Sequence, residues 1–398
     1  MQTITNKTTW RFSEKVNHIP KSFIREILKI TAQPDVISFA GGLPNPSSFP
    51  VDAIKQAAVK VLEKDGENVL QYAPSDGYLP LRKYIAGRYQ NKGIQISEDE
   101  ILITNGSQQG LDLLGKIFID AGDSVLVERP SYLGAIQAFS AYQPNYHSIE
   151  LLDDGVDTEH LKMLLEKENP KFFYSIPNFQ NPTGLSYSID KRKIVADLID
   201  RSNSVLIEDD PYGEIKFTQR DNSPIKKFLG SKGILLGSFS KIISPGMRLG
   251  WVAADRTIIE KLLVAKQACD LHSNFLSQRI IYQFLMNNDV EKHIQSIIQL
   301  YKIQKDHMIE CIKTYLPGGV RHTNPDGGMF IWLTLPEHIS AYHLLDLTSK
   351  QKLVFVPGEV FYTDKKYSNT LRLNYTNSNR EEIEKGIEII GKSLRELI

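Results

Sequence analysis

Short apolar runs alternate with helical stretches over the middle of the chain, from about residue 99 to residue 254. The runs are rich in β-branched residues and too short for helices, which predicts strands buried on both faces. Apolar strands separated by helices indicate an α/β fold, in which helices cover both faces of a mostly parallel sheet. The expected strands are residues 101–104, 124–127, 146–149, 172–176, 205–208, 234–238 and 249–254. Ligands bind at the carboxyl ends of such strands, so the residues that follow these runs are candidates for chemistry.

The pattern outside this region predicts further helices and a second, smaller domain. Turn and strand patterns at 324–332 and 371–375 favour α+β structure near the C-terminus. Helical periodicity favours helices at 22–31, 52–64 and 79–89, mostly helix from 257 to 315, and an amphipathic helix at 380–397. We therefore expect an N-terminal arm and helix that pack with the small domain (1–48), a large domain (49–290) and a small C-terminal domain (291–398).

Composition argues against several classes of function. The chain has 398 residues with 47 basic and 47 acidic side chains, so its formal net charge is zero. A neutral chain without a like-charge run gives no electrostatic reason to expect nucleic acid or an anionic membrane as a partner. The two cysteines suggest neither a disulfide framework nor a metal site. The N-terminal stretch is polar and no apolar run approaches the ~18 residues of a membrane span, so we expect a soluble cytoplasmic protein.

The stretch 237–251 carries the most distinctive candidate chemistry. Lys241 comes directly after an apolar run, with Ser238 and Ser240 beside it and Arg248 seven residues later. A buried lysine amine loses proton affinity and becomes a nucleophile for an aldehyde. The two hydroxyls and the guanidinium are donors that suit a phosphate. An aldehyde and a phosphate on one small molecule describe pyridoxal 5′-phosphate (PLP), whereas a lysine taken alone is most often a solvated surface charge.

Other polar residues also follow predicted strands. Ser107 and Gln108 open a helix, where free amides bind phosphate readily, although Ser107 could simply cap that helix. The loop lacks the Gly-x-Gly-x-x-Gly spacing, which disfavours a dinucleotide site. Asp209 and Asp210 end a strand, and a carboxylate there could keep the pyridine nitrogen of PLP protonated. Solvated loop charge is the alternative for both.

Arg372 lies within the apolar run 371–375. An unpaired buried guanidinium is costly, so this side chain needs an anionic partner. A structural salt bridge and a bound substrate carboxylate would each satisfy it, and the pattern alone does not decide between them.

Several longer motifs occur along the chain in a definite order. They are Gly-Gly-Leu-Pro (41–44), Asn-Pro-Thr-Gly (181–184), Asp-Asp-Pro-Tyr (209–212), and Ser-x-Ser-Lys followed by Pro-Gly-Met-Arg-Leu-Gly-Trp (238–251). From about residue 20 to the C-terminus the chain resembles the fold-type I, class I and II aminotransferases, most of all the subgroup with 2-aminoadipate and kynurenine aminotransferases. The resemblance implies the PLP-dependent transferase fold, with a mostly parallel seven-stranded sheet flanked by helices and a smaller α+β domain.

The resemblance also implies contacts with the cofactor. Lys241 would hold PLP and then move a proton as general base and acid. Asp209 would pair with the pyridine nitrogen, with Asp210 as the alternative if the register is off by one. Tyr212 and the amide of Asn181 would donate to the phenolic oxygen, and Tyr132 would stack on the ring. The residues implied for the phosphate are Ser107, Gln108, Ser238, Ser240 and Arg248.

Substrate contacts and a dimer follow from the same resemblance. Arg372 would bind the substrate α-carboxylate, with Asn181 and the backbone of Gly42 beside it. Tyr72 would reach across a homodimer interface to the phosphate of the neighbouring subunit's cofactor; taken alone, it could be an ordinary half-buried aromatic residue.

The implied activity is transfer of an amino group from an L-amino acid to a 2-oxo acid by a ping-pong mechanism. The expected donors are of the 2-aminoadipate, aromatic or branched-chain type, and 2-oxoglutarate is the expected acceptor. A β-eliminating PLP lyase on the same fold and a ligand-sensing domain are the alternatives. About 35 residues precede the fold, which is short for a DNA-binding domain. Arg25 could meet a distal substrate carboxylate or could be exposed.

Overall fold

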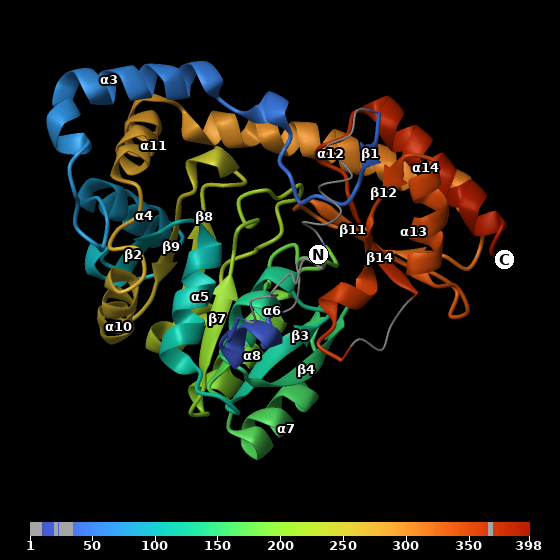
Figure 1. Cartoon of the computed structure of the whole chain (residues 1–398), viewed down its shortest axis with the longest axis horizontal. Coiled ribbons are helices and arrows are strands. Elements are labelled where there is room, and N and C mark those ends of the chain that lie inside the picture. Colours follow the sequence, from blue (N-terminus) through green and yellow to red (C-terminus); the bar gives the residue numbers. More distant parts are fainter. Residues whose placement is uncertain (1–9, 20–22, 24–34, 365–368) are drawn as a thin grey trace, which may run out of the picture.

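The computed structural model describes residues 10–19, 23, 35–364 and 369–398. In Figure 1 a large sheet with its helices occupies the left and lower centre, and the C-terminal elements lie on the right. Helix α12 (Val290–Tyr315) runs between the two parts. In the described ranges, no helix combines the length and apolar character needed to cross a membrane. The expected helix at 22–31, with Arg25, lies outside the described residues apart from Phe23.

The large sheet has eight strands and contains all seven that the apolar runs predict. In spatial order they are β2 (Ile101–Thr104), β9 (Gly250–Ala253), β8 (Gly233–Ser238), β7 (Val205–Asp209), β6 (Phe172–Ser175), β3 (Ser124–Arg129), β4 (Asn145–Leu152) and β5 (Gly155–Val156). The pairs from β8 to β4 are parallel, whereas β9 is antiparallel to both of its neighbours. The additional strand β5 is a two-residue segment that folds back on β4 at the edge.

Both faces of the central strands are buried, which explains their nearly continuous apolar sequences. In β8, Leu235 belongs to the hydrophobic core on one face of the sheet and Leu236 to the core on the other. Ile103 and Leu102 alternate in the same way in β2, as the two-residue period of a strand requires. The principal helices of this part are α3 (Val51–Val69), α4 (Leu79–Asn91), α5 (Ser107–Phe118), α6 (Leu133–Ser140), α7 (Thr158–Glu168), α8 (Ile189–Asp200), α10 (Arg256–Gln267) and α11 (Phe275–Asn287).

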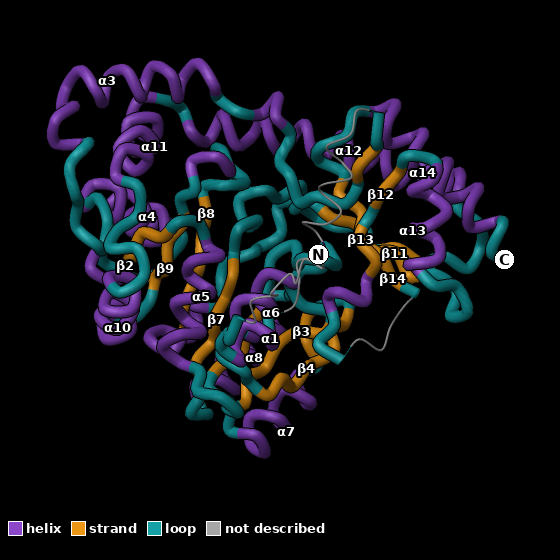
Figure 2. Tube along the Cα trace, viewed as in Figure 1, coloured by secondary structure: helices purple, strands orange, loops and turns teal. Residues whose placement is uncertain are grey.

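The C-terminal part is built on a smaller antiparallel sheet, visible as a second group of strands in Figure 2. Its order is β10 (Arg321–His322), β11 (Phe330–Thr334), β14 (Thr370–Asn374) and β13 (Val356–Pro357). Helices α13 (Ala341–Lys350) and α14 (Arg380–Arg395) pack together beside this sheet, and α14 also packs on α12. Strand β1 (Ile37–Ser38) pairs with β12 (Leu353–Val354), which ties the N-terminal segment to this part. The predicted domain boundaries at 49 and 291 stay predictions.

Candidate active site

A cavity of about 250 Å³ lies at the carboxyl ends of β7 and β8 and beside the start of α5. This is where a doubly covered parallel sheet is expected to bind its ligand. The predicted site residues that line it are Gly42, Ser107, Gln108, Tyr132, Asn181, Asp209, Tyr212, Ser238, Ser240, Lys241, Arg248 and Arg372. Tyr72 is the predicted residue that does not line it.

One end of the cavity is a cup for an anion at the N-terminus of α5. Gly106 has a φ of 77° and directly precedes Ser107, the first residue of the helix. A Cβ on Gly106 would lie 2.8 Å from Nη2 of Arg248, so glycine keeps the helix end and the guanidinium close together. The free amides and dipole of the helix attract negative charge, and the hydroxyls of Ser107 and Ser240 lie in the same wall. A phosphate fits this set of donors.

Lys241 follows β8 and lines the middle of the site. Its Nζ donates a hydrogen bond to the carbonyl oxygen of Gly42 over 2.8 Å. Burial, and then the positive charges of Arg372 and Arg248, lower the pKa of Lys241 to about 8. A substantial fraction of the amine is therefore neutral near physiological pH and able to attack an aldehyde.

Asp209, the last residue of β7, presents a carboxylate oxygen that has no hydrogen-bond partner within the described ranges. Its Oδ2 accepts a hydrogen bond of 2.9 Å from the hydroxyl of Tyr174, whereas the buried Oδ1 accepts none from the described residues. Burial raises the pKa of Asp209 to about 7, and the nearby carboxylates of Asp210 and Glu128 add to the rise. A cationic donor beside Oδ1 would hold this carboxylate in its ionised form.

Asp210 is the alternative to Asp209 for the contact with the pyridine nitrogen, and it lies in a different environment. It is not part of the cavity wall, and its Oδ1 accepts a hydrogen bond of 3.0 Å from the amide of Asn178. The structure therefore brings Asp209, rather than Asp210, to the cavity.

Arg372 reaches the cavity from β14, where it is almost fully buried. Its guanidinium lies over the rings of Phe330 and Phe361, with centroid distances of 4.2 and 5.1 Å. Its Nη1 donates to Oδ1 of Asn181 over 2.8 Å and its Nη2 to the carbonyl of Ala40 over 2.5 Å. Both acceptors are neutral, and Nε is buried without a partner among the described residues. Burial lowers the pKa of Arg372 to about 10, which leaves the side chain charged at neutral pH.

Hydrogen bonds within the site hold its remaining polar side chains in place. Asn181 donates from Nδ2 to the hydroxyl of Tyr212 over 3.3 Å. Gln108 donates from Nε2 to the carbonyl of Gly134 over 2.7 Å, and its Oε1 lies 3.4 Å from the hydroxyl of Tyr132. These contacts fix the positions of the groups before any ligand arrives.

Tyr72 lies at the surface, in the segment that follows α3. Its side chain is 78% exposed and touches the ring of His272 edge-on, with 5.9 Å between the ring centroids. Tyr72 is therefore more exposed than the ordinary half-buried aromatic residue that the sequence left as the alternative.

Sequence reasoning missed several residues at this site. Tyr174 supports Asp209 from the neighbouring strand β6, and its one signal was a hydroxyl within an otherwise apolar buried run. Gly106, Ile176 and Leu43 also line the cavity. Gly106 could have been found as the residue between a strand and a helix N-terminus, and Leu43 as a member of the Gly-Gly-Leu-Pro motif, whereas Ile176 carries no distinguishing pattern.

The donor set fits PLP on three separate observations. The anion cup suits the phosphate, the amine of Lys241 with its lowered pKa suits the aldehyde, and the unpaired Oδ1 of Asp209 suits a protonated pyridine nitrogen. These residues would hold the cofactor from its phosphate, its aldehyde and its ring nitrogen.

The fold and this donor set define a PLP-dependent enzyme of fold type I. Within that class, the chain belongs to the family of class I and II aminotransferases, whose model matches residues 34–390. The resemblance found in the motifs is thereby confirmed.

Curated relatives match almost the whole chain. An aromatic-amino-acid aminotransferase of Thermococcus litoralis is 41% identical over 97% of this chain and 94% of that protein. A 2-aminoadipate transaminase of Thermus thermophilus is 38% identical over 97% of each. Among solved structures, the kynurenine aminotransferase of Pyrococcus horikoshii is 40% identical and covers 97% of both chains, with a TM-score of 0.93. The chain is therefore a PLP-dependent aminotransferase that acts on amino acids and 2-oxo acids.

Proposed function

We propose that this aminotransferase takes its amino group from an L-amino acid of the 2-aminoadipate, aromatic or branched-chain type, with 2-oxoglutarate as the acceptor. The names of the relatives support these donors, since they act on aromatic amino acids, 2-aminoadipate and kynurenine. The observation that carries the proposal is that Arg372 and Lys241 line one cavity. A carboxylate anchor and a nucleophilic amine on one cavity are what an α-amino acid requires.

Arg372 binds the α-carboxylate of both substrates. Its positive charge faces neutral oxygens of Asn181 and Ala40, so a substrate carboxylate would be its first anionic partner in the described structure. The buried Nε supplies a further donor. Because charge-assisted hydrogen bonds are strong in a dry site, this contact orients the substrate Cα.

Lys241 moves the proton. Bound in this cavity, PLP supplies an aldehyde for the substrate amine and a ring that takes up the electrons of the Cα–H bond. Lys241 would hold the cofactor through its aldehyde, and its Nζ would then act as the general base and acid that takes the proton from the substrate Cα and returns it. Donor and acceptor use the same lysine and the same arginine in turn, which supports a ping-pong order.

The other predicted residues hold the ring. Asp209 keeps the pyridine nitrogen protonated through its unpaired Oδ1. Tyr212 and Asn181, which contact each other, donate to the phenolic oxygen. Tyr132 covers one ring face and excludes water from it.

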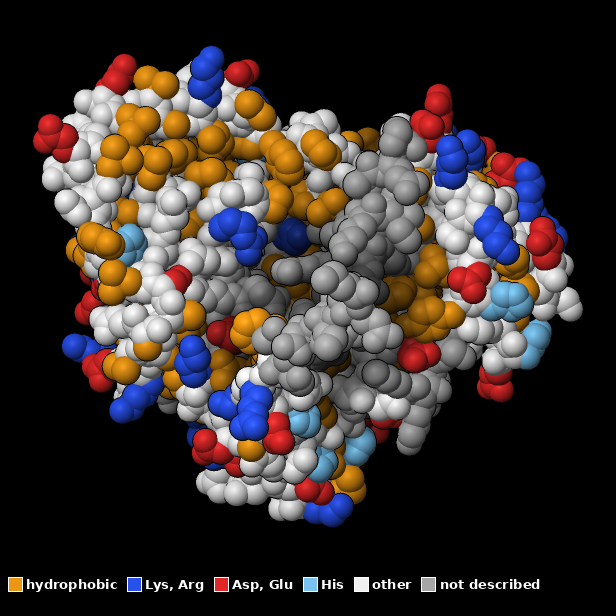
Figure 3. Space-filling model, in the orientation of Figure 1, with side chains coloured by type: hydrophobic (Ala, Val, Ile, Leu, Met, Phe, Trp, Pro, Cys, Tyr) orange, Lys and Arg blue, Asp and Glu red, His pale blue; other side chains and the backbone are white. Residues whose placement is uncertain are grey.

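The active unit is a homodimer in which Tyr72 of each subunit reaches the phosphate in the other. Hydrophobic side chains gather over α3 and its surroundings in Figure 3. Val51, Val59 and Leu62 are 68%, 48% and 44% exposed, and helical periodicity puts them on one side of α3. Leu70 is 70% exposed and lies close to Tyr72 in the sequence. An apolar surface of this kind supports a protein interface.

Coexpression of two impaired chains tests the shared site. We expect Tyr72→Ala to lower activity by about tenfold, through loss of a hydrogen bond to a charged group. In a hybrid of a Tyr72→Ala chain with a Lys241→Ala chain, one of the two sites has both residues intact. Equal coexpression should therefore restore roughly a quarter of the wild-type rate, because half of randomly assembled dimers are hybrids. If Tyr72 served its own chain, no hybrid site would be complete and the rate would not rise above that of the separate variants.

A panel of amino donors with 2-oxoglutarate tests the substrate assignment. We expect kcat/KM for tyrosine, phenylalanine, kynurenine and 2-aminoadipate to exceed that for alanine and aspartate by about tenfold or more, from burial of the longer side chain. Product formation would be followed by the release of glutamate. A preference for aspartate or alanine would contradict the assignment while leaving aminotransferase activity in place.

A further inference from the structure

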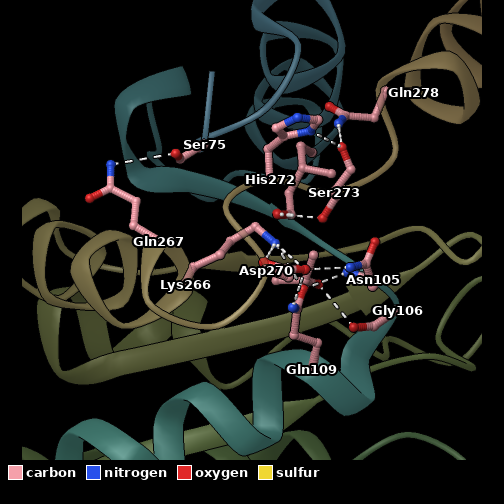
Figure 4. A network of polar contacts seen from close by, with 12 residues as sticks. Ser75, Asn105, Gly106, Gln109, Lys266, Gln267, Asp270, His272, Ser273 and Gln278 are labelled. Carbon is pink, nitrogen blue, oxygen red and sulfur yellow. Dashed lines mark hydrogen bonds and ion pairs between the residues drawn. The ribbon is translucent and has the colours of Figure 1, made fainter. Parts of the chain in front are cut away.

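An ion pair between a buried lysine and a partly buried aspartate lies behind the anion cup, at the end of α10. Lys266 has no exposed side-chain surface, and its Nζ lies 2.8 and 3.0 Å from the two carboxylate oxygens of Asp270. Figure 4 shows both side chains pointing toward Asn105 and Gln109, which lie on either side of the start of α5. The pair thus packs directly against the turn that opens the helix.

The ion pair is hydrogen-bonded to this turn at several points. Oδ2 of Asp270 accepts from Nδ2 of Asn105 over 2.5 Å and from Nε2 of Gln109 over 2.6 Å. The Nζ of Lys266 donates to Oε1 of Gln109 over 3.0 Å, and the same oxygen accepts from the backbone amide of Asn105 over 2.8 Å. The network therefore fixes both the side chain and the backbone of Asn105.

Asn105 in turn contacts the phosphate-binding side of the site. Its carbonyl oxygen accepts a hydrogen bond of 3.2 Å from Nη2 of Arg248, and it directly precedes Gly106 and Ser107. One residue thus joins the ion pair to the guanidinium and to the free amides of α5. A shift of Asn105 would move both sets of phosphate donors.

Stability alone is a weak explanation for such a pair. Lys266 is fully buried and Asp270 is 24% exposed, so the desolvation of Lys266 offsets much of the attraction between the two charges. Such a pair adds little to stability compared with apolar side chains of similar size. Burial lowers the pKa of Lys266, and the hydrogen bond and charge of Asp270 oppose that fall. What the pair does supply is a set of charge-assisted hydrogen bonds with fixed directions.

We propose that Lys266 and Asp270 are positioning residues that hold the turn 104–109 and Arg248 in the shape that binds the cofactor's phosphate. The proposal rests on the proposed phosphate contacts of Ser107 and Arg248. The pair is neutral overall, so it acts through geometry rather than through attraction to the phosphate. Its loss should weaken binding of ligands that carry a phosphate and leave ligands without one unaffected.

Binding of PLP and of pyridoxal, which lacks the phosphate, tests this inference. Both would be titrated into cofactor-free protein and followed through the visible absorbance of the bound ligand. We expect Asp270→Asn to raise the Kd of PLP by about tenfold or more and that of pyridoxal by no more than about twofold. The amide that this substitution introduces has one acceptor oxygen in place of two, so if that oxygen stays with Asn105 and Gln109 its NH2 group faces the Nζ of Lys266. The neutral side chain also leaves the charge of Lys266 unpaired.

Three further variants make the result decisive. Glu260→Gln is the matched control, because Arg256 and Glu260 form an ion pair of the same spacing on the exposed side of α10. This variant should leave the Kd of PLP and the Kd of pyridoxal unchanged. Gln109→Ala keeps the ion pair and its direct hydrogen bond to the side chain of Asn105, but it removes the contacts that Gln109 makes with the pair and with the backbone amide of Asn105. It should therefore show a PLP-specific loss even if Asp270→Asn fails to fold. Arg248→Met tests the phosphate site itself.

The outcomes distinguish failure of the positioning role of Lys266 and Asp270 from failure of the proposed phosphate contacts. The positioning role would be overturned if Asp270→Asn or Gln109→Ala weakened the binding of PLP and of pyridoxal equally. It would also be overturned if neither variant weakened the binding of PLP. If Arg248→Met also left PLP binding unchanged, the proposed phosphate contacts would be wrong as well. Weakened PLP binding in Arg248→Met, with no PLP-specific loss in the other two, would overturn the positioning role alone.

Discussion

We expect replacement of Lys241 with alanine to abolish transamination and to leave the fold intact. We expect kcat to fall by at least about four orders of magnitude, because the variant loses both the amine that holds the cofactor and the group that moves the Cα proton. The fold should survive, since Lys241 is a desolvated cation near Arg372 and Arg248 and its removal relieves their repulsion. Oxo acid formation and the melting temperature of the cofactor-free protein are the two measurements.

Lys261→Ala is the control for loss of a lysine in general, because Lys261 is exposed on α10 and takes no part in the site. This control should keep the wild-type rate and melting temperature. Turnover by Lys241→Ala within tenfold of wild type would contradict the assignment of the proton transfer. Loss of the fold in that variant would contradict the stated electrostatic reason.

Asp209→Ala has the second largest expected effect. We expect kcat to fall by two to three orders of magnitude, about the loss seen when a preorganised charge-stabilising group is removed from a buried site. PLP should remain bound, because the phosphate cup and Lys241 are untouched. The physical reason is Oδ1, which has no partner among the described residues and in the proposed function would keep the pyridine nitrogen protonated so that the ring accepts electrons. Pre-steady-state measurement of Cα proton abstraction would locate the loss in that step.

Asp210→Asn is the matched control for this prediction. Asp210 lies next in the sequence and is hydrogen-bonded to Asn178 away from the cavity wall. We expect its rate to fall by less than about tenfold, since the amide can keep one of its contacts. If Asp209→Ala kept a near-normal kcat while Asp210→Asn lost most of its activity, the contact with the pyridine nitrogen would belong to Asp210 instead of Asp209.

The sequence predicts the large sheet well because its strands are buried on both faces. The stretch from Ile234 to Leu236 is apolar at every position, and this pattern can be read without knowing the neighbouring strands. Strand β5 was missed because two residues after a turn carry no periodicity. The split of the chain into three segments stays a prediction.

The site residues were found through motifs, while the groups that support them were not. Tyr174 contacts Asp209 across two adjacent strands, and that contact depends on the register of β6 against β7. Lys266 lies in an amphipathic helix, where a lysine is expected to be solvated, and only the packing of α10 against the start of α5 buries it. Contacts between segments distant in sequence are set by tertiary structure, which a single sequence does not contain.

The visible spectrum of the purified protein during addition of one amino acid, without any oxo acid, tests the central claim most directly. We predict that the absorption band of lysine-bound PLP gives way to that of the pyridoxamine form, with stoichiometric release of the matching oxo acid. A PLP band that persists, or that returns while ammonia is released, would contradict transamination and favour a sensor or a lyase. Absence of any PLP band would contradict the role of Lys241 itself.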